Sequence, residues 1–216
     1  MPVRKIPKNY LHVTGSFASQ KNGRMLGFES LLEKEYMTLM EFDEAVDHFE
    51  EQPTSIPIPG SSQSYTPDLL VHFRAIKPHA AIPRPLLIEI KHTSDLAKNG
   101  HKYASKFAAA KSYAEKNGWE FIVITEKEIR TPRLANLKFL REFRNIYPKE
   151  GDITAVLEVL KSAKKKLTFH EIKSALHSDT RDVLSWIPII WHLVITRKLM
   201  VDMDRPLTDE AFLWLP

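Results

Sequence analysis

Three stretches of the chain have the apolar, β-branched composition of strands in the interior of a sheet: residues 68–76, 85–91 and 119–129. A proline-containing connection joins the first two, so we predict that they pair as antiparallel neighbours. Between the last two, residues 101–118 place apolar side chains at three- and four-residue spacing and end at Asn-Gly, which predicts a helix and its stop. A helix between two strands implies a crossover, so the last two strands should be parallel.

Upstream of these strands, the pattern GFESLLEKEYMTLMEFDEAV (27–46) also has helical spacing. Residues 51–67 hold four prolines and several serines, which predicts short strand fragments and a loop. Residues 1–24 are basic and weakly periodic, and we predict a basic N-terminal arm there. Residues 25–147 are then predicted to form an α/β domain, a mixed sheet flanked by helices.

The rest of the chain, residues 148–216, changes to a helical pattern. ITAVLEVLKSAKK predicts one helix and TFHEIKSAL a second, with Thr168 and Glu171 at capping-box spacing. A third helix is predicted within residues 180–199, where Pro188 marks a kink or a later helix start. The C-terminal residues predict a β-hairpin. Three helices and a hairpin indicate a small winged-helix-like domain.

Composition narrows the class of protein. Hydrophobic residues make up 43% of the 216 residues and charged residues 27%, as is typical of a globular chain. No apolar run approaches the roughly 20 residues of a membrane span, and the N-terminal residues have no signal-peptide core. Zero cysteines exclude disulfides and thiolate metal sites. We therefore expect a cytoplasmic protein with no membrane partner.

The positive charge is unevenly distributed. Residues 1–28 carry five lysines and arginines and no acidic residue, and KSAKKK (161–166) is a second basic cluster. Such clusters suit a polyanionic partner such as DNA. Each cluster taken alone is equally compatible with solvated lysines.

The stretch PLLIEIK places Glu89 and Lys91 within an apolar strand, on the same face because strand side chains alternate. Burying either charge is costly unless it has a partner. Either the strand end is open to solvent, or the pair is held there for chemistry. The same Glu-Ile-Lys tripeptide recurs at residues 171–173, where the packing of a capped helix explains it.

Asp68 opens an apolar strand about 20 residues upstream, where it is either an ordinary strand-start residue or a functional group. In the functional interpretation, Asp68 and Glu89 meet at adjacent strand ends and share Mg²⁺ or Mn²⁺, with the backbone carbonyl of Ile90 as a further ligand. Lys91 would orient or deprotonate the attacking water and offset charge at a phosphate. Glu33, at the edge of the upstream helix stripe, is either a third carboxylate of this site or a solvated residue.

Glu33, Pro67-Asp68 and Glu89-Ile90-Lys91 together resemble the pattern of the PD-(D/E)xK nuclease superfamily. FESLLEKEYMTLMEFDEAVDHFEEQP, followed by YTPDLLV, LLIEIK and WEFIVITEKEI, is similar to TnsA, the endonuclease subunit of heteromeric TnsA/TnsB transposases. The similarity in sequence covers residues 25–140. The last 65 residues are similar to the family mainly in their predicted architecture.

The resemblance implies a restriction-endonuclease-like fold and a Mg²⁺-dependent endodeoxyribonuclease, with two metal ions and with Mn²⁺ also supporting activity. The family's catalytic positions correspond to Glu33, Asp68, Glu89 and Lys91, and its metal ligands to the three acids with the Ile90 carbonyl. TnsA cuts the 5′, non-transferred strand at transposon ends, while the transposase TnsB cuts and joins the 3′ strand. The C-terminal domain engages the AAA+ regulator TnsC. Such proteins act in the bacterial cytoplasm, and compact members occur in CRISPR-associated transposons.

Two other functions fit parts of the pattern. A stand-alone restriction or repair endonuclease could read DNA through the helix-turn-helix elements. A non-catalytic adapter could bind DNA or protein with the same fold, although it would not need four ionisable groups around a metal. The sequence has no HExxH zinc motif and no nucleotide-binding P-loop, so any ATP is hydrolysed by a partner.

Overall fold

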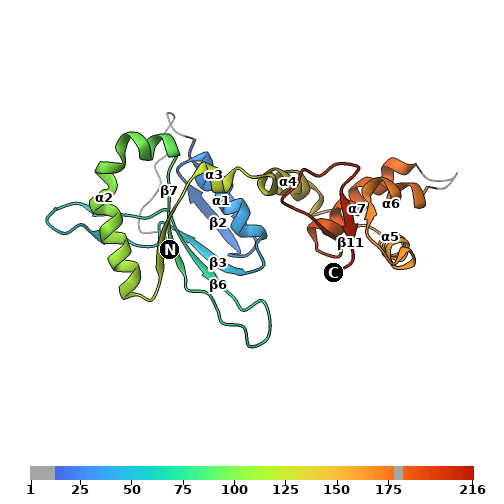
Figure 1. Cartoon of the computed structure of the whole chain (residues 1–216), viewed down its shortest axis with the longest axis horizontal. Helices are drawn as coiled ribbons and strands as arrows, with labels where there is room; N and C mark the ends of the chain where they lie inside the picture. Colours follow the sequence, from blue (N-terminus) through green and yellow to red (C-terminus); the bar gives the residue numbers. More distant parts are fainter. Residues whose placement is uncertain (1–12, 178–181) are drawn as a thin grey trace. The chain divides into compact units, whose positions relative to one another are not determined.

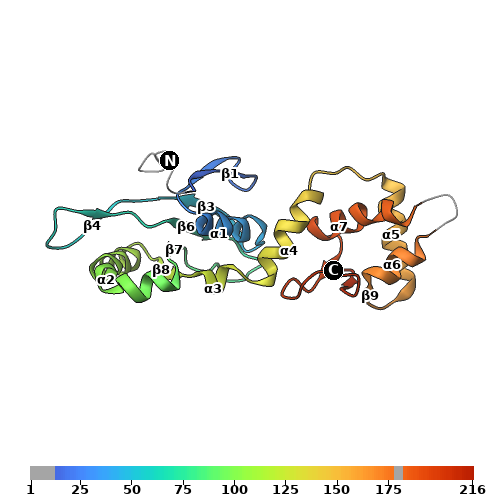
Figure 2. The ribbon, with the colours of Figure 1, turned by 90° about the horizontal axis from the view of Figure 1, so that it is seen from above.

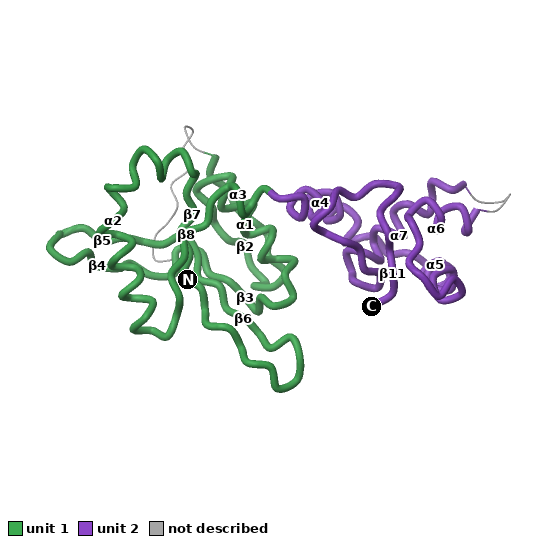
Figure 3. Tube along the Cα trace, in the orientation of Figure 1, with its two compact units in different colours: residues 1–130 green, residues 131–216 purple. Residues whose placement is uncertain are grey.

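The computed structural model describes residues 13–177 and 182–216. The chain divides into two compact units, residues 1–130 and residues 131–216, which Figure 3 draws in different colours. Each unit has its own hydrophobic core, so each is described by itself.

The division between the units falls earlier than the boundary predicted at residues 147–148. Helix α4 (Pro132–Leu140) lies in the second unit because its apolar side chains pack there. Leu140 belongs to the buried core of that unit, and the ring of Phe139 meets the ring of Trp191 edge-on at 5.6 Å. Tertiary packing, rather than a change in local pattern, therefore sets the boundary.

A four-stranded sheet is the centre of the first unit. Its strands, in spatial order, are β3 (Val46–Glu51), β6 (Leu69–Phe73), β7 (Leu86–Ile90) and β8 (Glu120–Ile124). The pairs β3–β6 and β6–β7 are antiparallel, and β7–β8 is parallel. Helix α2 (Thr93–Lys116) makes the crossover between β7 and β8. The predicted mixed α/β sheet is confirmed, although the helix begins eight residues earlier than its periodic stretch.

Helices cover the two faces of this sheet, as Figures 1 and 2 show. Ala110 of α2 packs with Leu70 and Leu87. Helix α1 (Leu31–Phe42) lies on the opposite side. Because strand side chains alternate, a residue two positions away from Leu70 in β6, or from Leu87 in β7, lies on the face of the sheet that α2 covers.

The described part of the predicted N-terminal arm is a β-hairpin. Strands β1 (Gly15–Ser19) and β2 (Arg24–Phe28) pair along their whole length. The predicted arm, residues 1–24, is thus corrected from residue 15 onward, and residues 1–12 lie outside the described residues. Leu26 and Phe28 are buried, so the hairpin is part of the packed unit.

An ion pair joins this hairpin to the edge strand β3. Two nitrogens of Arg24 each lie 2.7 Å from an oxygen of Glu51, whose side chain is almost fully buried. Strand β3 was not predicted from the sequence, because VDHFEE carries three acids and lacks the composition of a strand. Its buried glutamate is tolerated only because Arg24 reaches it from a distant part of the chain.

Short elements complete the first unit. They are the hairpin of β4 (Ile56–Pro57) and β5 (Ser64–Tyr65), within the proline-rich stretch, and helix α3 (Glu126–Ile129). The stretch predicted as a strand to residue 129 therefore ends as a strand at Ile124 and continues as a helical turn.

The second unit has the helix–strand–helix–helix–strand–strand order of a winged helix. Its elements after α4 are η1 (Arg141–Phe143), α5 (Glu150–Ala163), β9 (Leu167–Thr168), α6 (Phe169–Ala175), η2 (Val183–Trp186), α7 (Ile187–Ile195), β10 (Met200–Val201) and β11 (Phe212–Trp214). The three strands form one antiparallel sheet in the order β10-β11-β9. The predicted capping box of Thr168 and Glu171 is present, and Pro188 lies in the first turn of α7, at a new helix start.

Across the described ranges of the chain, no helix combines the length and the hydropathy that crossing a bilayer requires.

Candidate active site

Antiparallel pairing of β6 and β7 brings Asp68 and Glu89 to the same end of the sheet. Leu69 pairs with Ile88 in the register, so Asp68, just before β6, lies opposite Glu89. Asp68 accepts a hydrogen bond on Oδ2 from the backbone N–H of Ile90 at 2.6 Å. Its other carboxylate oxygen makes no hydrogen bond to any described residue. The sequence-predicted meeting of these two acids at neighbouring strand ends is therefore present in the fold.

Glu89 is buried, with 4% of its surface exposed, and it has a partner for each carboxylate oxygen. The ammonium Nζ of Lys91 lies 2.6 Å from Glu89 Oε1, and the hydroxyl of Tyr65 donates to Glu89 Oε2 at 2.5 Å. Lys91 Nζ also donates to the carbonyl oxygen of Ile90 at 3.2 Å. These contacts explain how the strand holds two charged residues among apolar neighbours.

The close grouping shifts the proton affinities of these residues. Burial, and then the charge of Glu89, raise the pKa of Asp68 well above its usual range, against the opposing effect of Lys91. Burial opposes the charged form of Lys91, but Asp68 and Glu89 outweigh it and raise the pKa of Lys91. Lys91 is thus an ammonium at neutral pH, which is the form that donates hydrogen bonds and offsets negative charge.

Glu33 has a structural role at the start of α1, where Ser30 and Glu33 stand at the Ser-x-x-Glu spacing typical of a helix N-terminus. Ser30 is the N-cap of α1 and accepts from the N–H of Glu33, while the Glu33 carboxylate accepts from the Glu29 N–H and the Ser30 hydroxyl, each at 2.8 Å. Burial raises the pKa of Glu33, and Lys91 opposes this effect. Glu33 is therefore within electrostatic reach of Asp68 and Lys91, but its oxygens cap a helix.

A cavity of about 620 Å³ opens over the strand ends. Asp68, Glu89 and Lys91 line it, and Glu33 is not among the described residues that do. The other polar groups of the lining were not predicted as site residues from the sequence; they include Glu29, Gln52, Tyr65, Tyr103 and Lys106. Tyr65 stands three residues before Asp68 in YTPD, which is the one local signal that could have identified it.

Gln52 is the strained member of the lining. Its φ of 44° is in the left-handed region, which a non-glycine residue seldom adopts, and its backbone N–H donates to the carbonyl of Asp68 at 2.9 Å. Its side-chain Oε1 is buried and accepts no hydrogen bond from any residue the structure describes. Gln52 therefore carries a buried oxygen whose hydrogen-bonding capacity is unmet.

The donor set fits a hard divalent cation. Glu89 Oε1 and the Ile90 carbonyl both face one positive charge, the Lys91 ammonium, and Asp68 offers a free oxygen beside them. Carboxylate and carbonyl oxygens are the ligands that Mg²⁺ and Mn²⁺ prefer.

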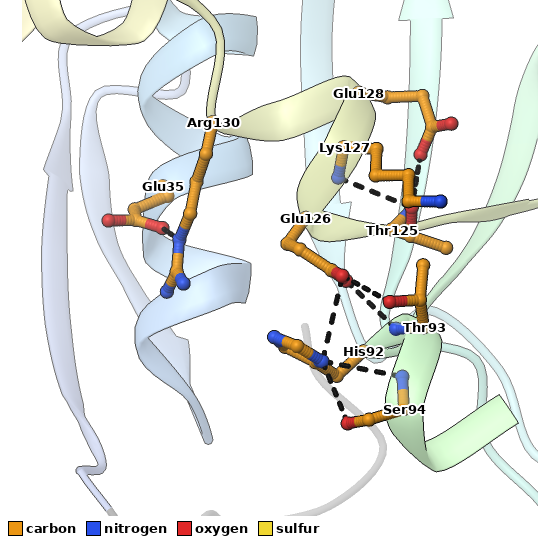
Figure 4. Close-up of polar contacts among 9 residues, drawn as sticks. All are labelled: Glu35, His92, Thr93, Ser94, Thr125, Glu126, Lys127, Glu128 and Arg130. Atoms are coloured by element: carbon orange, nitrogen blue, oxygen red, sulfur yellow. Dashed lines mark hydrogen bonds and ion pairs between the residues drawn. The ribbon is translucent and has the colours of Figure 1, made fainter. Parts of the chain in front are cut away.

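The chain segment directly after Lys91 is held by a polar network, shown in Figure 4. His92 is the N-cap of α2, and its side chain accepts from the N–H of Ser94. Glu126 of α3 accepts hydrogen bonds from both the N–H and the hydroxyl of Thr93, and it lies 3.6 Å from His92 Nδ1. The network holds the end of β7, next to Lys91, against the first turns of helices α2 and α3.

Glu126 makes this network sensitive to acid. The Thr93 hydroxyl, with help from backbone N–H groups, lowers the pKa of Glu126 from 4.5 to about 2. A depressed folded-state pKa means that the contacts stabilise the fold fully above pH 4.5, and that this contribution is lost as the pH falls towards 2.

We expect Glu126→Gln to have a lower Tm than the wild type at pH 7, with the difference shrinking below pH 4.5. Melting curves from pH 7 to pH 2 measure this, with the exposed Glu115→Gln as the control; a constant difference would contradict it.

Comparison with known families gives two matches, to consecutive parts of the chain. The family described as TnsA-like endonuclease N terminal matches residues 43–126, and the family described as TnsA endonuclease C terminal matches residues 128–203. No curated protein matches the chain. Asp68, Glu89 and Lys91 lie inside the first match, whereas Glu33 precedes it.

The two matches together span residues 43–203, and they agree with the mixed sheet of the first unit. TnsA proteins are nuclease subunits that act on DNA within a transposition complex of several proteins, and nucleases of this kind typically use divalent metal ions. The chain therefore belongs to the TnsA family, as an endonuclease subunit of a transposase.

Proposed function

We propose that this subunit is a Mg²⁺-dependent endonuclease that cuts the 5′, non-transferred strand at transposon ends, so that the element leaves its donor site by cut-and-paste. The observation that carries the proposal is the grouping of Asp68, Glu89 and Lys91 in one cavity at the ends of β6 and β7. A non-catalytic adapter has no use for this set of buried charges, since each costs stability unless it serves a purpose.

In this proposal, Asp68, Glu89 and the Ile90 carbonyl hold the metal; Mn²⁺ can replace Mg²⁺, and two ions take part. Glu33 is the proposed third acid, acting through its electrostatic reach to Asp68 and Lys91. When bound, the cations supply positive charge at the scissile phosphate and make water a better nucleophile. The water oxygen bonds to phosphorus, one backbone P–O bond breaks, and the leaving oxygen takes up a proton.

Lys91 is the proposed residue that stabilises charge on the phosphate. Its ammonium already lies against two oxygens that face the cavity, Glu89 Oε1 and the Ile90 carbonyl. A cation bound to these oxygens would compete with Lys91 for them, which leaves the ammonium to interact with the anionic substrate. Lys106 lines the same cavity from α2, and no described residue forms an ion pair with it, so it suits a neighbouring backbone phosphate.

TnsB and TnsC are the proposed protein partners. TnsB would cut and join the 3′ strand, and TnsC would engage the winged-helix unit, residues 131–216. The sheet of that unit leaves Phe212 more than half exposed, which is compatible with a protein contact on the wing.

The test is cleavage of end-labelled transposon-end DNA in Mg²⁺ and in Mn²⁺, with and without TnsB and TnsC. We expect metal-dependent cutting of the 5′ strand that requires the partners. Cutting without partners would favour a stand-alone restriction or repair endonuclease instead. If the wild type joins the complex yet cuts neither strand in either metal, the adapter reading replaces the proposal.

Tyr65→Phe should weaken cleavage without abolishing it. The substitution removes only the hydroxyl that donates to Glu89, and a hydrogen bond to a charged group contributes about 1.5–3 kcal/mol. We therefore expect a loss of about 10- to 100-fold at limiting Mg²⁺, with part of the activity restored at high Mg²⁺. Rates over a range of Mg²⁺ concentrations measure this. A loss that is the same at every Mg²⁺ concentration would contradict a role in positioning the ligand Glu89.

A further inference from the structure

Two histidines face each other across strands β3 and β6, away from the catalytic carboxylates. His48 pairs with His72 in the register, and their rings stack with centroids 4.3 Å apart and planes 9° from parallel. Glu50 is the next residue of β3 on the same face. One ligand atom from each of the three residues lies within 4.8 Å of the others.

A second carboxylate orients the first histidine. Asp47 Oδ2 lies 2.9 Å from His48 Nδ1, and a carboxylate can only accept, so Nδ1 carries the proton. The lone pair of His48 is then on Nε2, which is the arrangement that carboxylate–histidine pairs produce around bound metals. Arg74 lies 3.8 Å from the other oxygen of Asp47 and helps to keep that carboxylate ionised.

The second histidine has a nitrogen that the rest of the fold does not use. His72 Nε2 is buried and makes no hydrogen bond within the described part of the chain, although Glu50 Oε1 is 3.4 Å away. Buried polar atoms are normally paired, so an unused ring nitrogen beside a carboxylate requires an explanation. A cation would satisfy both groups at once after one of the stacked imidazole rings rotates, since a ring nitrogen donates its lone pair in the plane of the ring.

We propose that His48, His72 and Glu50 bind one divalent transition-metal ion, for which Zn²⁺ is the representative. Two imidazoles and one carboxylate are a ligand set for Zn²⁺ and its neighbours rather than for Mg²⁺, which prefers oxygen. The side chains are 44%, 26% and 38% exposed, so water can complete the coordination.

The site is separate from the proposed catalytic metal. His72 is four residues along β6 from Asp68, which corresponds to about 13 Å along a strand. Its metal would clamp the edge strand β3 to β6, across the register shift between Val46 and His48. The role is structural, so its test does not depend on nuclease activity.

The experiment is a calorimetric titration of the metal-free full chain with Zn²⁺, repeated with Co²⁺ to read ligand type from its visible absorption. We expect one equivalent bound at the histidines, counted in Asp68→Ala so that the proposed catalytic metal site does not contribute, and a Tm that rises with Zn²⁺. His72→Gln, Glu50→Gln and the more exposed His48→Asn should each weaken binding at least tenfold. In the Asp68→Ala background, the exposed helix variant His101→Gln should bind Zn²⁺ as its parent does.

Two results would overturn the proposal: no binding by the wild type, or binding that His72→Gln and His48→Asn leave unchanged. Melting curves without metal separate loss of ligands from loss of fold. His48→Asn serves as the second variant because His48 is the less buried of the two histidines.

Discussion

Lys91→Ala reduces strand cleavage at least 10²- to 10³-fold, the expected cost of removing one group that stabilises charge in the transition state. The variant also leaves Glu89, 4% exposed, with Tyr65 as the one remaining side-chain partner among its described contacts. Asp68→Ala removes a proposed metal ligand and is expected to lose activity to at least the same extent. Single-turnover cleavage of transposon-end DNA in saturating Mg²⁺, in the presence of the partner proteins, measures both.

The chain contains its own control for this experiment. Lys173 belongs to a second Glu-Ile-Lys tripeptide, in the capped helix α6, where it forms an ion pair with Asp209 at 2.8 Å. Lys173→Ala should cut the DNA at the wild-type rate. If Lys91→Ala is folded and also cuts at that rate, the assignment of the site to β6 and β7 is wrong.

Trp191→Ala lowers the free energy of unfolding of the winged-helix unit by about 3–5 kcal/mol, the range for truncating a buried large aromatic side chain. Trp191 is 4% exposed. Its ring stacks on Phe169 at a centroid distance of 4.3 Å and meets Phe139 edge-on at 5.6 Å. The substitution therefore opens a cavity where α4, α6 and α7 meet.

Urea denaturation followed by circular dichroism measures this loss. Trp214→Ala is the matched control, because that ring is only partly buried and its described contact is the ammonium of Lys166 at 3.8 Å. An exposed cation–π contact is worth about 0.5–1 kcal/mol. Equal losses in the two variants would mean that Trp191 is not the centre of the core.

Local patterns were sufficient for the elements that obey local rules. Apolar, β-branched composition predicted β6, β7 and β8. Alternation placed Glu89 and Lys91 on one face, because the side-chain period of a strand is two residues. The Asn-Gly stop of α2 and the capping box of α6 also follow from interactions within a few residues. Short-range sterics and hydrogen bonds act in the same way wherever the segment lies in the fold.

Other features depend on partners that are distant in the sequence. Strand β3 exists with a buried Glu51 because Arg24, 27 residues away, neutralises it. Glu89 on β7 is likewise held by Tyr65, which is 24 residues away in the sequence. These assignments required knowledge of what each side chain meets in space.

The sequence by itself determined the strand order along the chain, the family pattern and the two acids with one lysine that are proposed to act together. The tertiary structure alone decided that Tyr65 and Gln52 complete the cavity, that α4 belongs to the second unit, and that His48 meets His72. The physical reason is that propensity and periodicity act over a few residues, whereas burial, charge pairing and cavity shape arise only when distant segments pack.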